Sequence, residues 1–394
     1  MATRRTAAVC LVLALLFVWP FSASAEDAFP YREGTCDKGE LKYVGGLPVL
    51  IVQGTPEEMG RQQAGLTADA ARDVLAYPRK LLAAIGREDR WPALVEMSRR
   101  LKPQIAEEYV DELNAFAATA GLDPELLIAI NTMVDAYRDG LACSSLIVEP
   151  DRSKTGGPLF GRNLDFFPVG VLQRLSLVVV YRPEGKHAFV SVGFPGMLGC
   201  FSGMNDAGLA VATHEVFVTR DGAPMFDPKG TPYTFSLRRI LEECTTLEEA
   251  EKLLRSTPRT TLQSLAVCDR RTSGVLELTP RNVVLRRSER GIAACANHFR
   301  TEPLARFLVS RRYRILSGAR RLDKLGLDDV ARKLDEVNLG RLTIQTMIFE
   351  PDPLVLHLAI GSPPTSRLPL VRLELAELFQ PTGSRGSPGQ VSVR

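Results

Sequence analysis

Cys143 opens a short apolar run, and a second short run follows it after a turn-rich gap. If the two runs pair as a hairpin centred on residue 154, Cys143 stands opposite Asp165, and Leu146 stands opposite Arg162. Strict alternation points Arg162 and Asp165 to opposite faces, because they are three residues apart. A twist near Asn163 would let both reach the thiol, which would bring a nucleophile, an acid and a cation to one end of one hairpin.

A thiol nucleophile needs a base, and histidine is the usual one. No papain-like signature surrounds Cys143, and "GCFSG" (199–203) has its serine misplaced for a nucleophile elbow. The four histidines lie in or beside predicted strands, where packing or surface roles are commoner than catalysis: His187, His214, His298 and His357.

The α-amino group of Cys143 itself is a second candidate base. An N-terminal amine has an ordinary pKa of about 7.7 to 8.0, so much of it is neutral near that pH. This base exists only if the bond between Ala142 and Cys143 is broken, and an N-to-S acyl shift followed by hydrolysis would break it. Arg162 and Asp165 would then hold the thiolate and the ammonium by charge-assisted hydrogen bonds.

The segment before Cys143 has helical patterning after one strand at 47–54. Thr55 with Glu58 forms a capping box that opens a helix, and Pro78 is expected to break it. A second helical stretch closes at Gly121, and a third begins at Pro124. We therefore expect residues 26–142 to be mostly helical.

From Cys143 onward the spacing of apolar residues is typical of short strands, and glycine and proline lie between these strands. Helices return in pairs, the first pair containing Thr246 and Glu249 as a second capping box. Sheets layered between helices are expected, which is an α+β fold or a four-layer arrangement. Strands are predicted at 144–149, 159–166, 175–182, 187–194, 208–216, 261–271, 274–279, 282–288, 291–299, 343–350 and 354–361, and helices at 234–244, 247–256, 303–319 and 328–337.

The ends of the chain are predicted to lie outside the fold. Residues 1–25 have the charged, apolar and small-residue regions of a signal peptide cleaved after Ala25, and an uncleaved membrane anchor is the alternative. We therefore expect an exported protein, periplasmic or extracellular, that is not stably inserted in a membrane once the signal peptide is removed. The tail, 381–394, is rich in Gly, Ser and Pro and is predicted to be disordered.

Charge and cysteine spacing exclude several functions. The net charge of +3 is too slight for a nucleic-acid surface. No C-x-x-C pair, other metal-ligand spacing or phosphate-cradling glycine loop occurs, so no metal or organic cofactor is implied. Some cysteines could pair in an oxidising compartment. They are Cys36, Cys143, Cys200, Cys244, Cys268 and Cys295, apart from Cys10 in the predicted signal peptide.

Five motifs in order resemble the N-terminal-nucleophile cysteine hydrolases. They are "CSSLIVE", "GRNLDF", "GMNDAGLAV", "ANHF" and a helix with an Arg-Tyr step, and "GTPEEMGRQQAGL" and "YVDELNAFAATAGL" add to them in the helical half. The chain is similar, over about 54–378, to the isopenicillin-N/aminopenicillanic-acid acyltransferase-like family. Acid ceramidases and choloylglycine hydrolases are more distant relatives. The resemblance implies a four-layer αββα sandwich over 143–380, with 26–142 as the smaller of two chains cut from one precursor.

The resemblance also assigns roles to single residues. Cys143 would be the nucleophile and new N-terminus, with Arg162 and Asp165 orienting it. The backbone N–H of Asn205 and the side-chain amide of Asn297 would donate to the oxyanion. The later family arginine maps onto Arg312, with Arg311 adjacent.

Each assignment has a structural alternative. Asn205 could shape a hairpin turn, Asn297 could cap a strand, and Arg312 could be a solvated helix residue. Many relatives carry Thr where this chain has Ser144, and an aromatic residue where it has Leu164, so substrate preference is not carried over.

Together these features predict an exported amide hydrolase or acyltransferase that acts on a small acylated substrate through a Cys143 thioester. "DFFPVGVL" (165–172) and "GFPGMLGCF" (193–201) suggest an apolar acyl group. A non-catalytic binder of acylated ligands with an intact Ala142–Cys143 bond, and a serine hydrolase using Ser144 or Ser145, are the alternatives. The sequence fits both hydrolysis and acyl transfer, and it fits both a monomer and a homo-oligomer.

Overall fold

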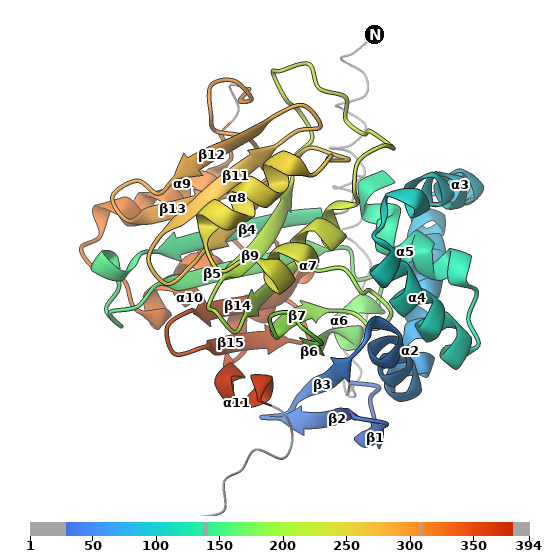
Figure 1. Cartoon of the computed structure of the whole chain (residues 1–394). Coiled ribbons are helices and arrows are strands. Elements are labelled where there is room, and N and C mark those ends of the chain that lie inside the picture. Colours follow the sequence, from blue (N-terminus) through green and yellow to red (C-terminus); the bar gives the residue numbers. More distant parts are fainter. Residues whose placement is uncertain (1–28, 137–140, 307–308, 381–394) are drawn as a thin grey trace, which may run out of the picture.

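The computed structural model describes residues 29–136, 141–306 and 309–380, which form two sheets between layers of helices (Figure 1). The only parallel pairing among the described strands is that between β3 and β6. The ten-stranded sheet has the order β1 (Gly34–Cys36), β2 (Gly39–Val44), β3 (Leu47–Gly54), β6 (Leu177–Pro183), β7 (Phe189–Gly193), β8 (Ser202–Asn205), β9 (Ala210–Glu215), β10 (Gln263–Cys268), β11 (Ser273–Leu278) and β12 (Val283–Arg287). The six-stranded sheet has the order β13 (Ile292–Cys295), β4 (Leu141–Val148), β5 (Leu159–Phe166), β14 (Thr343–Glu350), β15 (Val355–Ile360) and β16 (Val371–Glu374).

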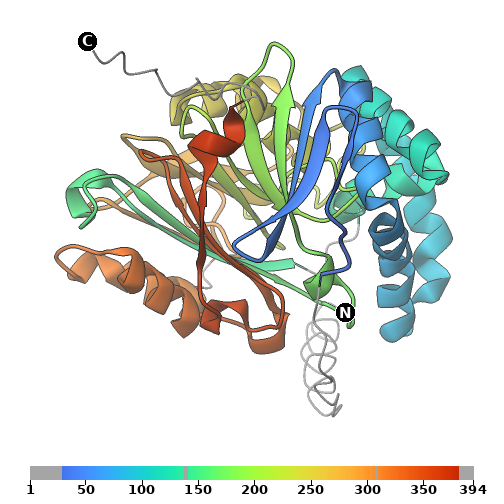
Figure 2. The same ribbon diagram turned by 90° about the horizontal axis from the view of Figure 1, so that it is seen from below.

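Alternation along the strands separates the core into layers. Val49 and Val178 of the larger sheet pack with Phe160 and Met347 of the smaller one, which places an apolar layer between the sheets. The outer face of the larger sheet is covered by α2 (Pro56–Ala84), α4 (Glu107–Ala120), α5 (Pro124–Ala136), α7 (Tyr233–Glu243) and α8 (Leu247–Ser256), and α3 (Trp91–Leu101) packs on α5. The outer face of the smaller sheet is covered by α9 (Arg311–Ser317) and α10 (Leu327–Glu336), and Figure 2 shows α10 in orange below it. The short helices α6 (Leu172–Leu175) and α11 (Leu375–Phe379) complete the α/β/β/α sandwich, which confirms the predicted fold.

The segment before Cys143 is part of this sandwich. Its first three strands form one edge of the larger sheet, and β3 pairs with β6 in the register Val49↔Val178. Described residues on both sides of Cys143 therefore share a sheet, and the rest of the first segment is mostly helical, as predicted.

Helix ends follow the sequence signals with two differences. Thr55 and Glu58 bond reciprocally, and Gly121 ends α4 with φ +63°. The predicted break at Pro78 is wrong, because α2 continues through it to Ala84. The second capping box is shifted: Thr246 accepts from the Glu249 N–H, but the Glu249 carboxylate accepts from the backbone N–H of Thr245.

The predicted helix over 303–319 is wrong for the described residues 303–306 and 309–310, which are not helical. Ser310 caps α9, which begins at Arg311. Upstream, the Glu277 carboxylate accepts from the N–H groups of Arg300 and Thr301 and from the Thr301 hydroxyl. These bonds fix the residues just before 303, and the Leu304 and Ala305 N–H groups then donate to the Thr301 carbonyl in a single turn. The strands β1, β2, β8 and β16 were not predicted.

Several expectations concern residues beyond the described part. The signal peptide with its cleavage after Ala25 and the tail 381–394 both lie outside it. Among the described residues, no helix is long and apolar enough to cross a membrane. The six described cysteines are all free thiols.

Candidate active site

The hairpin of β4 and β5 carries Cys143 at one end. Cys143 pairs with Leu164, Ser145 with Arg162, and Ala142 with Asp165. The predicted register is therefore wrong by one residue. The connection between the strands opens with a tight turn over Pro150–Arg152. The centre of the hairpin therefore falls half a residue before residue 154, which shifts each pair of facing residues by one. The shift puts Cys143, Ser145 and Arg162 on the face that meets the larger sheet.

Arg162 is the charged group of that face. Its Nη1 donates to the Thr213 carbonyl at 2.8 Å, and its side chain is fully buried. Within the described residues, its Nε and Nη2 have no hydrogen-bond partner. Burial raises the pKa of the Cys143 thiol, and the positive charge of Arg162 opposes that rise. The arginine thus provides the positive charge that a thiolate at Cys143 requires.

Asp165 reaches the site from the other face of β5. Thr343 pairs with Asp165 and Gln345 with Leu164, so Ile344 is an extra residue in β14 and forms a bulge beside the site. The Asp165 carboxylate accepts from Thr343 Oγ1 at 2.5 Å and from Arg312 Nη1 at 2.6 Å. Burial raises the pKa of Asp165, and Arg312 and Thr343 counteract it.

Arg312 connects the members of the site. Besides Asp165, its Nη2 donates to the Cys143 carbonyl at 3.0 Å and to Asn297 Oδ1 at 2.7 Å. Arg311, the alternative, is exposed. The structure therefore brings Arg312 rather than Arg311 to Cys143, because Ser310 caps α9 and fixes which residue faces the sheet.

Asn297 follows β13 and faces the main chain of Cys143. Its Oδ1 accepts from the Cys143 N–H at 2.9 Å, and its Nδ2 donates to the Glu215 carbonyl at 2.9 Å. The amide thus holds the nitrogen that scission would free. Its predicted donation to an oxyanion would have to use the second Nδ2 hydrogen.

Asn205 is not brought to this site. It lies at the turn between β8 and β9, where its backbone N–H donates to the Leu209 carbonyl and its Nδ2 donates to the carbonyls of Leu241 and Cys244. An N–H already bonded within a turn is not available to an oxyanion. The geometry matches the alternative of a residue that shapes a hairpin turn.

The two serines after Cys143 differ in their surroundings. The Ser144 hydroxyl is buried with no hydrogen-bond partner among the described residues. Ser145 Oγ lies 2.9 Å from His214 Nε2, and the His214 Nδ1 lies 3.2 Å from the Ser264 carbonyl. Burial, then the charge of Arg162, lowers the pKa of His214 well below its usual range. Ser145 and His214 are both wholly enclosed between the sheets.

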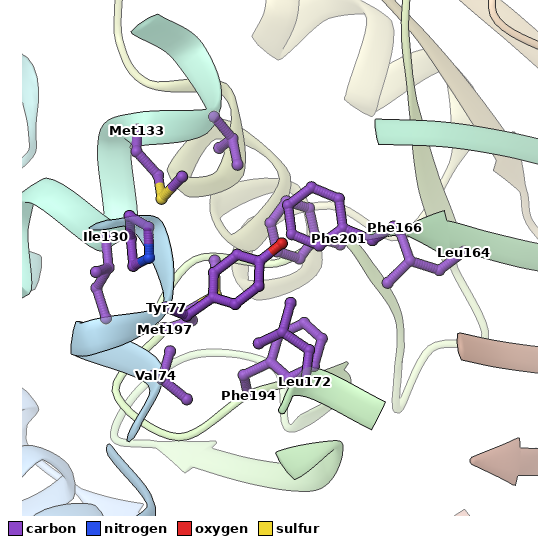
Figure 3. A pocket seen from close by; sticks show the side chains of 12 residues that line it. Val74, Tyr77, Ile130, Met133, Leu164, Phe166, Leu172, Phe194, Met197 and Phe201 are labelled. Carbon is purple, nitrogen blue, oxygen red and sulfur yellow. The ribbon is translucent and has the colours of Figure 1, made fainter. Parts of the chain in front are cut away.

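An apolar pocket adjoins Leu164, the residue opposite Cys143. The cavity between its walls is about 20 Å³, so its own side chains nearly fill it in this structure. Figure 3 shows Tyr77, Ile130 and Met133 of the helical half on one side, with Phe194 and Phe166 on the other. The complete lining is Val74, Tyr77, Pro78, Ile130, Met133, Val134, Leu164, Phe166, Leu172, Phe194, Met197 and Phe201.

The sequence motifs missed two groups that support the site. Thr343 holds Asp165, and the Thr213 carbonyl holds Arg162. A strand-end threonine and a backbone carbonyl leave no signal in residue spacing, so only the pairing of strands reveals them. No group of three or more His, Cys, Asp or Glu suited to a metal occurs within the described ranges.

Comparisons with known proteins show what the chain is similar to. The family model described as acyl-coenzyme A:6-aminopenicillanic acid acyl-transferase matches residues 152–326, which confirms the resemblance inferred from the motifs. A protein of Archaeoglobus fulgidus described as uncharacterized is 25% identical over 260 residues, or 57% of this chain. The match spans 42% of that relative, so less than half of its length is represented.

Solved structures of three hydrolases are also similar at low identity. A conjugated bile acid hydrolase mutant from Clostridium perfringens is 16% identical, with a TM-score of 0.43 over 61% of this chain and 95% of its own. An N-acylethanolamine-hydrolyzing acid amidase ortholog from Caenorhabditis elegans is 16% identical, with a TM-score of 0.43 over 59% and 100%. Penicillin V acylase from Agrobacterium tumefaciens is 13% identical, with a TM-score of 0.42 over 61% and 89%.

Proposed function

We propose that this chain, whose resemblance to the acyl-coenzyme A:6-aminopenicillanic acid acyl-transferase family is confirmed over 152–326, is an exported, self-cleaving cysteine amidohydrolase or acyltransferase. The observation that carries the proposal is the setting of Cys143. Its sulfur lies beside Arg162, its N–H is bonded to Asn297, and its carbonyl is bonded to Arg312.

In the maturation step, the Cys143 sulfur attacks the carbonyl carbon of Ala142. The bond from that carbon to the Cys143 nitrogen breaks, the nitrogen takes the thiol proton, and a thioester joins Ala142 to the sulfur. Water then hydrolyses the thioester, releasing a carboxylate on Ala142 and a free amine on Cys143. Asn297 Oδ1, which already accepts from that nitrogen, is positioned to accept from the resulting amine or ammonium.

In turnover, the free amine takes the proton of the Cys143 thiol as the sulfur attacks the acyl carbon of an amide. The ammonium returns that proton to the leaving amine, and the acyl group remains on sulfur as a thioester. Water or a second amine then takes the acyl group. The pocket beside Leu164 supports an apolar acyl group, because all its lining residues are apolar or aromatic.

The test compares intact mass and amidase activity of purified protein with those of Cys143→Ala, Cys143→Ser and Cys268→Ala. Cys268 is a buried thiol in β10 that takes no part in the hydrogen bonds of the described site, and it serves as the matched control. We expect two chains, the larger beginning at Cys143, in the native protein and in Cys268→Ala. We expect one uncut chain without activity in Cys143→Ala, and some cleavage in Cys143→Ser. Activity from a single intact chain would overturn the mechanism, and one inactive chain would favour a binder of acylated ligands.

A further inference from the structure

The segment joining β7 to β8 forms one wall of the apolar pocket. Phe194, Met197 and Phe201 of this segment, residues 194–201, line it. The opposite wall comes from α2 and α5, which precede Cys143 in sequence. The width of the pocket therefore depends on how this segment, called the wall loop below, is held against the helices.

Asn131 of α5 holds the wall loop by its backbone. Its Oδ1 accepts from the N–H of Leu198 at 2.7 Å and of Gly199 at 3.4 Å. Its Nδ2 donates to the Gly196 carbonyl at 2.8 Å and to the Leu127 carbonyl of its own helix at 2.9 Å. Both hydrogens and both acceptor positions of this buried amide are used, so its orientation is fixed.

The wall loop also approaches the helices closely at Gly196. This residue has φ +78°, and a Cβ there would lie 3.2 Å from Leu127 Cδ1 and 3.6 Å from Ala71 Cβ. On the other side, Arg238 of α7 donates to the Leu198 carbonyl at 3.1 Å. The loop is thus bound on one side by α5 and on the other by α7.

The wall loop continues toward the reacting residues. The Phe201 carbonyl accepts from the N–H of Thr213, and the Thr213 carbonyl accepts from Arg162. Displacing the wall loop would change the pocket directly, because three side chains of the loop form one wall. It would affect Arg162 only through the longer connection by way of Thr213.

We propose that Asn131 is a specificity-determining positioning residue, which sets the pocket width for an apolar acyl group by fixing the wall loop. The proposal rests on the proposed function. Asn131 touches no reacting atom, and it contributes through the backbone of 196–199. Because α5 precedes the cut, the smaller chain would supply this determinant to the nucleophile of the larger one.

The first experiment measures kcat/KM of N-acetyl and N-decanoyl anilides with the native protein, Asn131→Ala, Asn131→Asp and Gln62→Ala. Asn131→Asp keeps the two accepted bonds and loses donation to the carbonyls of Gly196 and Leu127. Gln62 is a buried amide in the same helical half that bonds the backbone of Gln53, away from the pocket lining, and is the matched control. We expect Asn131→Ala to lower the decanoyl value about tenfold relative to the acetyl value, equivalent to about 1.4 kcal/mol. Asn131→Asp should also lower this ratio, and Gln62→Ala should leave it unchanged.

The second experiment separates this proposal from the proposed function. Binding of N-decanoylglycine and N-acetylglycine is measured by calorimetry in the Cys143→Ala background, with and without Asn131→Ala, so that no catalysis is needed. A decanoyl affinity reduced about tenfold supports the role of Asn131 even if the native protein hydrolyses neither anilide. An unchanged decanoyl-to-acetyl ratio in both experiments overturns the role of Asn131 even if the native protein is an active amidase.

Discussion

Replacement of Arg312 by methionine tests the construction of the site most directly. The guanidinium donates to Asp165 Oδ2, to the Cys143 carbonyl and to Asn297 Oδ1, and the change removes all three bonds at once. Methionine keeps much of the aliphatic volume, so the loss is mainly one of charge and hydrogen bonds.

The magnitude follows from burial. Asp165 is fully buried, and the Arg312 side chain is 15% exposed. Removing one partner of a buried ion pair costs about 3 to 5 kcal/mol, because the other charge stays buried. Thr343 still donates to Asp165, so we expect the lower end of this range, about 3 kcal/mol, as a loss in the free energy of unfolding.

The assay is urea unfolding of Arg312→Met, Asp165→Asn and the double variant, with Arg311→Met as control, all in the uncut Cys143→Ala background. Arg311 is the neighbouring exposed arginine, and its change should stay within about 0.5 kcal/mol. The double variant should be more stable than the sum of the single effects by about 2 kcal/mol, because a neutral amide in place of the Asp165 carboxylate leaves no charge unpaired. Additive single effects, or an Arg312→Met variant as stable as the control, would refute the reasoning.

Two further predictions concern groups near the site. Burial and the charges of Arg300, Arg286 and Arg312 lower the pKa of His298 to about 4, so the unfolded chain binds the proton more readily. Stability should therefore fall as the pH drops from about 6.5 toward 4, and in thermal melts His298→Gln should lose less of its Tm over that range than the native protein. In the helical layer, Arg238 pairs with Glu112 at 2.6 Å and with Glu242 at 2.8 Å, all three buried. Arg238→Met should cost about 3 to 5 kcal/mol in urea unfolding, whereas Arg239→Met, which removes an exposed pair with Glu243, should cost less than about 1 kcal/mol.

Local signals in the sequence predicted most elements, since caps and alternation depend on near neighbours. Strand β5 and the hairpin of β14 and β15 lie where the alternating pattern placed them. The helix predicted over 303–319 is wrong in 303–306, which follow a turn that Glu277, distant in sequence, fixes at Arg300 and Thr301. Pro78 failed as a helix breaker because tertiary packing around the pocket keeps α2 continuous.

The site residues were predicted unevenly for a similar reason. Cys143, Arg162 and Asp165 share one hairpin, so an approximate register was enough to bring them together. The one-residue error arose from the turn, whose geometry the gap sequence does not specify. Asn205 and Asn297 came from motif resemblance alone, and only the pairing of distant strands shows that Asn297 contacts Cys143 and Asn205 does not.

The parallel pairing of β3 with β6 carries a consequence for the cut protein. Strands from before Cys143 are hydrogen-bonded into a sheet whose remaining strands come after it. Once the chain is severed, the ladder between β3 and β6 joins two separate molecules, and denaturation would let them diffuse apart. Renaturation then becomes a second-order encounter whose rate rises with concentration, whereas the uncut precursor can regain its sheet alone.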